Sequence, residues 1–137
     1  MTREERINNL MGLKHSKDVF KGEVIPSTDP FFKEFEHSQD GVRAGTKILL
    51  TYVLVHGIRT IAGIINRWAP TSENDTEAYI NDVCKKTGKP PYYTLTDADI
   101  HNADFMVDLV KAIIYHENGE VTISDGIIRN GVIEAYA

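Results

Sequence analysis

One glutamate stands where the surrounding pattern asks for an apolar residue. Phe105, Leu109 and Ile113 repeat every four residues, as the buried face of a helix does, and the next position on this stripe is Glu117. Burial and the negative end of the helix dipole both disfavour a charged carboxyl, so the sequence predicts a raised pKa for Glu117. An acid that stays protonated near neutral pH is what cleavage of a glycosidic bond requires. The alternative is that the helix frays before Glu117, and that the carboxylate reaches water or pairs with a lysine or arginine.

Other patterns that support catalysis or metal binding are missing from the sequence. It contains no phosphate-binding glycine loop, nucleophile-elbow motif, zinc-protease motif or Cys-x-x-Cys pair, and its five histidines are scattered. The acidic run from Asp97 to Asp108 looks superficially like a calcium loop, but Asn102 stands where that loop needs a glycine. We therefore expect no metal and no cofactor.

Size and composition indicate one globular domain spanning residues 1–137. The chain is 42% hydrophobic and 26% charged, and its lone cysteine, Cys84, excludes an internal disulfide. No apolar run is long enough to span a bilayer, and the charged start of the chain is unlike a signal peptide. The net charge of −5 argues against a nucleic-acid partner. This charge is uneven, at +2 over residues 1–70 and −7 over residues 71–137.

The pattern predicts a mainly α (α+β) protein with a small irregular or β lobe over residues 1–37 and a helical region over residues 38–137. Turn-forming residues interrupt each apolar run of the first part. In the second part, capping residues and apolar periodicity predict five helices. These run from an N-cap at Ser38 to about His56, from Ile58 to Trp68, from Ser72 or Asn74 to Gly88, from Thr96 through His116 to Gly119, and from Ser124 onward.

Three N-terminal motifs and one C-terminal motif carry a resemblance to a known family. Asn8 to Lys14 (Asn-Asn-Leu-Met-Gly-Leu-Lys), Phe20-Lys21-Gly22 and Phe35-Glu36-His37-Ser38 are similar to a stretch of the peptidoglycan N-acetylglucosaminidases of the lysozyme superfamily. In that family the stretch follows a helix that ends in the catalytic glutamate. Here a similar helix end, His116-Glu117-Asn118-Gly119, occurs near the C-terminus. The resemblance implies a circularly permuted lysozyme-like fold with Glu117 as the catalytic acid, which is plausible because domain termini commonly lie close together at the surface.

A second resemblance covers nearly the whole chain. The segments Gly41 to Tyr52, Ile64-Ile65-Asn66-Arg67-Trp68-Ala69-Pro70 and Glu73 to Tyr79 look like phage and prophage proteins usually labelled virion or structural protein. This resemblance implies a location in the phage virion, or in the host cytoplasm before release, and other virion proteins as partners. A structural label neither establishes nor excludes activity.

The first resemblance also implies roles for further residues. Tyr79 would line the sugar cleft, Asn8 and Asn9 would order the loop that faces the glutamate, and Trp68 would stack on a sugar ring. From the pattern alone, Tyr79 is equally explained as a core residue, a single tryptophan at helical spacing such as Trp68 is more often core, and the two asparagines are explained as a polar loop.

The sequence does not fix a second carboxylate. The acids that could position water or stabilise an oxocarbenium ion are Asp75, Glu73, Glu36 and Asp29. A mechanism with a single acid, in which the substrate supplies the nucleophile, is also open.

Together these features predict a phage-derived glycosidase that degrades peptidoglycan at the bacterial cell wall. Its activity would be of the muramidase, glucosaminidase or lytic transglycosylase type. The alternative is a non-catalytic virion protein or a cell-wall-binding protein on the same fold.

Overall fold

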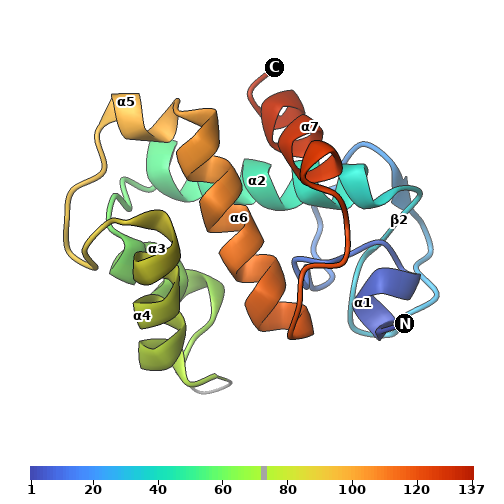
Figure 1. Cartoon of the computed structure of the whole chain (residues 1–137). Coiled ribbons are helices and arrows are strands. Elements are labelled where there is room, and N and C mark those ends of the chain that lie inside the picture. The colour runs from blue at the N-terminus through green and yellow to red at the C-terminus, as the bar shows by residue number, and fades with distance from the viewer. Residues whose placement is uncertain (72–73) are drawn as a thin grey trace.

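The computed structural model describes residues 1–71 and 74–137 and is mainly helical with one small sheet (Figure 1). This confirms the predicted mainly α (α+β) class. The described residues form seven helices: α1 (Arg3–Arg6), α2 (Ser38–Leu54), α3 (Ile61–Trp68), α4 (Thr76–Thr87), α5 (Asp97–Ile100), α6 (Ala103–Asn118) and α7 (Asp125–Ala135). None of these described helices is long and apolar enough to cross a membrane.

The N-terminal lobe contains two short antiparallel strands, β1 (Glu23–Val24) and β2 (Glu34–Phe35), with Glu23 opposite Phe35. It also contains α1, which the sequence pattern did not predict. This single turn begins with a capping box, in which the Thr2 hydroxyl accepts from the Glu5 amide and the Glu5 carboxylate accepts from the Thr2 amide. One turn is too short to show apolar periodicity, so only its cap residues could have indicated it.

Two predicted helix starts are corrected by one to three residues. Ser38 is the first residue of α2 and not its N-cap, because its hydroxyl donates to Asn8 Oδ1 at 3.1 Å. The helix expected from Ile58 begins at Ile61, since Thr60 supplies the cap by accepting from the Gly63 amide.

Two further helix starts also differ from the prediction. Asp75 caps α4 by accepting from the Ala78 amide, so the predicted cap Asn74 is wrong, and the other predicted cap, Ser72, lies outside the described residues. The segment expected to run unbroken from Thr96 is two helices, because the Asn102 side chain caps α6 anew at its N-terminus. The predicted end at Gly119 is confirmed, with this glycine in the left-handed conformation that closes α6.

α2 is the platform of the molecule. It packs most extensively against α7, and α6 crosses in front of it, while α3 and α4 lie together on one side of α6 (Figure 1). On the α2 surface, side chains at Gly41 and Gly45 would collide with the Asn8 carbonyl and with Met11. These two small residues therefore let the loop after α1 lie directly on α2.

A buried ion pair closes the N-terminal lobe. Lys33 is 1% exposed, and its ammonium lies 2.9 Å from the Glu23 carboxylate. Lys33 also donates to the backbone carbonyls of Ser16 and Asp18, so this cation holds the loop over residues 16–18 against the sheet. A buried charge without its partner costs several kcal/mol, so the pair must stay together in the folded state.

We predict that Glu23→Gln lowers the free energy of unfolding by roughly 3–5 kcal/mol, because it leaves the Lys33 charge buried without a counterion. Urea denaturation measures this loss. Asp104→Asn is the matched control, since it breaks the exposed Arg129–Asp104 pair, whose atoms are 2.8 Å apart but screened by water. Equal losses in the two variants would contradict the prediction.

Candidate functional site

Glu117 lies in the last turn of α6, on the wall of a cleft. The helix continues to Asn118, so it does not fray before the glutamate. The cleft has a volume of about 520 Å³. One side is lined by Gly12, Leu13, Lys14, Ser16 and Phe32, and the other by residues from α2, α3 and the loop after α3. The glutamate predicted from the apolar stripe is therefore at a cavity.

The carboxyl of Glu117 resists ionisation. Its pKa is raised to about 7, chiefly by burial and then by the negative charge of Glu4, while the positive charge of Lys14 opposes both. The sequence predicted the direction of this shift from burial. It did not indicate Glu4, which α1 brings close from the other end of the chain.

The loop facing Glu117 is ordered by Asn9. This side chain is fully buried; it donates to the carbonyls of Leu13 and Lys33 and accepts from the Leu13 amide, each at 2.8 Å. Asn8, in the left-handed conformation, donates to the carbonyls of Phe35 and Glu36. Neither asparagine lines the cleft, so both are placed to shape the loop and not to touch a ligand.

Gly12 brings this loop against the carboxyl. Its φ is +70°, and a Cβ built there would lie 2.6 Å from Glu117 Oε1. A glycine is thus needed both for the backbone conformation and for the close approach. Asn118 fastens the same contact by donating to the Leu10 carbonyl at 2.7 Å, which joins the end of α6 to the N-terminal loop.

Tyr79 lies behind Glu117, in the core between α4 and α6. It is 4% exposed and stacks on the His116 ring, with centroids 4.1 Å apart. His116 in turn lies 2.8 Å from Asp82. Burial and then the negative charge of Glu117 raise the pKa of Tyr79, and its hydroxyl is buried without a hydrogen-bond partner in the described part of the chain.

Trp68 forms part of the opposite wall of the cleft. Its ring meets that of Tyr52 edge to face at 6.3 Å, and Arg67 lies over the other part of this wall, 5.1 Å from the Tyr52 centroid. Sequence reasoning missed Tyr52 and Arg67 as cleft residues. Arg67 belongs to the Arg-Trp-Ala-Pro segment, which was the available signal, whereas Tyr52 was assigned to the apolar stripe of its helix.

The structure keeps three of the four candidate second carboxylates out of the cleft lining. Asp75 caps α4, and Asp29 accepts from the Phe31 and Phe32 amides. Glu36 is exposed beside His37 in another part of the surface. The fourth, Glu73, lies outside the described residues, next to Asn74, which does line the cleft.

A cluster of Glu36, His37 and Asp40 has ligand atoms within 4.8 Å of one another, and in the described part of the chain it is the one group spaced to hold a metal ion. It is largely exposed and separate from the Glu117 cleft. Exposed acidic groups of this kind need no ion, so we assign it no ligand.

This arrangement defines a mainly helical protein that holds one protonatable carboxyl in a cleft with an aromatic wall. The chain is 40% identical over 129 residues to Protein P5 of Pseudoalteromonas phage PM2, and the aligned region covers 92% of this chain and 77% of the phage protein. No protein-family model matches the chain. The chain belongs to the same family as this phage protein, and its function is phage-associated.

The raised pKa of Glu117 predicts a pH dependence of stability. A carboxyl that titrates near 4.5 when unfolded and near 7 when folded adds stability below about pH 4.5, and this contribution is lost as the pH rises through about 7. Glu117→Gln has no such loss. The free energy of unfolding of the variant, minus that of the wild type, should therefore increase by about 3 kcal/mol from about pH 4.5 to pH 8. Urea denaturation at both pH values measures this change. The same difference between variant and wild type at both pH values would contradict the prediction.

Gly12→Ala should move the Glu117 carboxyl. Gly88 has a similar φ of +74° but nothing within 4 Å of a built Cβ, so Gly88→Ala is the matched control. Both variants should lose about 1 kcal/mol of stability through backbone strain. Only Gly12→Ala should change the Glu117 pKa, as measured by NMR titration of the carboxyl carbon. An unchanged pKa would show that Gly12 does not pack against the carboxyl.

Proposed function

We propose that this protein is a phage glycosidase that degrades peptidoglycan, with Glu117 as the general acid. The observation that carries the proposal is the position of Glu117. It is a largely buried carboxyl with a pKa of about 7, on the wall of a cleft, facing the loop that resembles the glucosaminidase motif. A group with these properties keeps its proton in a large fraction of molecules near neutral pH and reaches a ligand in the cleft, as a general acid must.

In the proposed reaction, Glu117 donates its proton to the glycosidic oxygen as the bond to the anomeric carbon breaks. The leaving sugar departs as a neutral alcohol, and positive charge develops on the sugar that remains. Trp68 and Tyr52 offer aromatic faces along the cleft against which a sugar ring packs. Tyr79 supports the acid from behind, because its buried aromatic ring fills the core there and keeps water away from the carboxyl.

Two routes complete the reaction. In the first, a water attacks the anomeric carbon with help from a second carboxylate, for which Glu73 is the candidate next to the cleft-lining Asn74. In the second, a hydroxyl of the substrate attacks and gives its proton to the Glu117 carboxylate, or the acetamido oxygen attacks and water then opens the cyclic oxazolinium ion, so that Glu117 is the only protein acid needed. Hydrolysis leaves a reducing end, whereas attack by the sugar's own hydroxyl leaves an anhydro-sugar.

We further propose that residues 1–137 form one lysozyme-like domain in permuted order. The contact between Asn118 and the Leu10 carbonyl supports this, since it joins the glutamate helix to the motif that follows this helix in the glucosaminidases. The family membership supports a location in the phage virion with other virion proteins as partners. From there the protein acts on the bacterial cell wall.

Glu117→Gln should abolish lysis of purified peptidoglycan, because an amide cannot donate the proton. Wild-type activity should also fall about tenfold per pH unit above pH 7, as the acid ionises. Turbidity loss and mass spectrometry of the released fragments measure both effects, and the fragments distinguish reducing ends from anhydro-sugars.

Glu120→Gln is the control for this experiment. It removes the same charge from an exposed residue just beyond α6 and should leave lysis unchanged. Full activity in Glu117→Gln would refute the proposed acid. Binding of the wild type to peptidoglycan without any fragment release would instead favour the non-catalytic wall-binding alternative.

A further inference from the structure

We infer that a basic groove, continuous with the Glu117 cleft, binds the carboxylate-bearing stem peptides of a peptidoglycan strand. This inference rests on the proposed function for the class of polymer. The stem peptides would bind in a second cavity, of about 660 Å³. This cavity shares Ser16, Ile48, Tyr52 and Arg67 with the Glu117 cleft. The two cavities therefore form one groove with Glu117 in one arm.

The second arm, here called the basic arm, is built on one face of α2. Arg43, Lys47 and Thr51 follow one another at intervals of four residues and all line it. Residues at this spacing lie on the same side of a helix, about 6 Å apart along its axis. Arg67 of α3 closes the arm toward the Glu117 cleft.

The charges of the basic arm oppose the charge of the whole protein. Four cations, Lys21, Arg43, Lys47 and Arg67, line it together with one carboxylate, Asp18, whereas the chain as a whole carries −5. Lys21 lies 3.6 Å from the Glu134 carboxylate and the Lys47 ammonium donates to the Ala135 carbonyl, whereas Arg43 and Arg67 form no ion pair with any residue that the structure describes. Their charges are thus available to an anionic ligand, and a ligand with spaced carboxylates fits a row of cations on a helix face.

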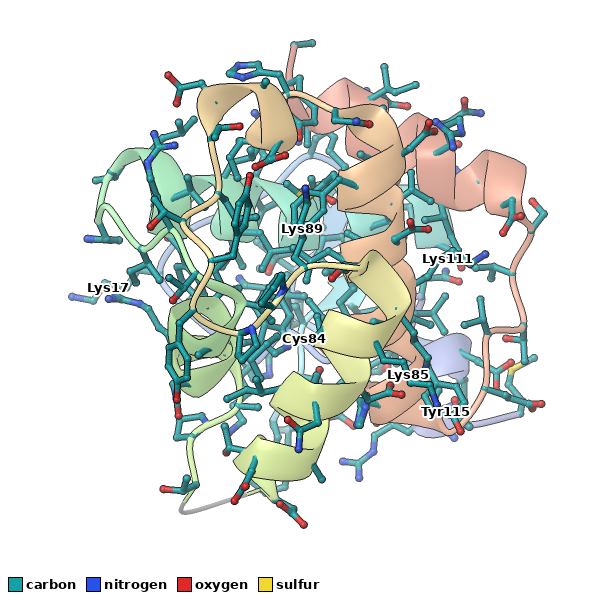
Figure 2. The ribbon with its side chains drawn as sticks, turned by 60° about the vertical axis from the view of Figure 1, so that its left-hand side comes forward. Lys17, Cys84, Lys85, Lys89, Lys111 and Tyr115 are labelled. Atoms are coloured by element: carbon teal, nitrogen blue, oxygen red, sulfur yellow. The ribbon has the colours of Figure 1, made fainter. Side chains whose placement is uncertain are left out.

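The floor of the basic arm is apolar. Val19, Phe20 and Ile48 line it, and Val19 is 68% exposed. A peptide with short alkyl side chains and free carboxylates matches both the floor and the cations. Lys17, between two of the lining residues, points away from the body of the molecule (Figure 2). A nucleic acid would need a broader basic surface than this confined arm on an acidic protein.

Another charged cavity fits an anion less well. Lys86 and Lys111 line it beside Tyr115, but so do Asp82 and Asp108, and Asp82 already pairs with Lys86 at 2.8 Å. The labelled Lys85, Lys111 and Tyr115 lie on the side of α4 and α6 seen in Figure 2. The cations of this cavity are balanced by their neighbours, so the basic arm is the stronger anion site.

The test measures binding, so that it does not depend on cleavage. Glu117→Gln protein is incubated with peptidoglycan whose glycan strands are coupled to beads, pelleted and quantified, first on the intact polymer and then on bead-bound glycan from which an amidase has removed the stem peptides. Adding Arg43→Gln and Arg67→Gln to this background should weaken binding to the intact polymer about three- to tenfold. Binding to the stripped glycan, which keeps only its lactyl carboxylates, should be weak and unaffected by the two changes.

Matched variants control for folding and for net charge. Lys85→Gln with Arg6→Gln removes two positive charges outside the basic arm and should leave binding to the intact polymer unchanged. Arg43→Lys with Arg67→Lys keeps the charge and should restore most of the binding. Salt should weaken the wild-type interaction, since exposed charges are screened.

Three results would overturn the inference: equal binding to intact and stripped polymer, no effect of the Arg43 and Arg67 changes, or equally strong Arg-dependent binding to duplex DNA. The failure of the proposed function is a different observation. Wild-type protein that releases no fragments, yet needs Arg43, Arg67 and the stem peptides for binding, would refute the glycosidase and leave the stem-peptide site standing.

Discussion

The structure depends on the burial of one carboxyl against one loop. Burial opposes the ionisation of Glu117, and the loop over residues 8–14 provides that burial by closing on the last turn of α6. The loop can do so because Asn9 satisfies the amide and carbonyl of Leu13 and binds the carbonyl of Lys33, and because Gly12 has no side chain at the point of contact. The acid and its environment are therefore a single feature, in which neither the helix nor the loop suffices alone.

That contact joins the two ends of the chain, so the rest of the fold must hold them together. α2 holds them together, because α7 packs on it and α6 crosses it. Its Gly41 and Gly45 leave room for the N-terminal loop to lie against it. The capping box of α1 then places Glu4 where its charge acts on Glu117. The buried Lys33–Glu23 pair fixes the loop over residues 16–18, which contributes Ser16 to both arms of the groove.

Local signals predicted the parts of the site, and long-range packing supplied the rest. The four-residue repeat and the terminal glycine depend only on neighbouring residues, so they placed Glu117 on the apolar face of α6, and this position indicated the direction of its pKa shift. The break between α5 and α6 was missed because Thr96 was taken as the only cap of this segment, whereas Thr96 caps α5 and Asn102 caps α6. The influence of Glu4 and the cleft positions of Tyr52 and Arg67 depend on contacts between distant segments, which periodicity does not encode.

The uneven charge of the sequence acquires a spatial meaning in this groove. Its cations come from α2, α3 and the loops before them, all within the first half of the chain, whereas its acid comes from the acidic second half. An anionic polymer favours such cations, but a cation beside a general acid lowers its pKa, as Lys14 does to Glu117. Arg43 and Lys47 lie in the other arm, where they can attract an anion with little effect on the pKa of Glu117. The effect of an exposed charge weakens with distance and with screening by water and salt. The groove thereby attracts an anion without forcing the acid to ionise.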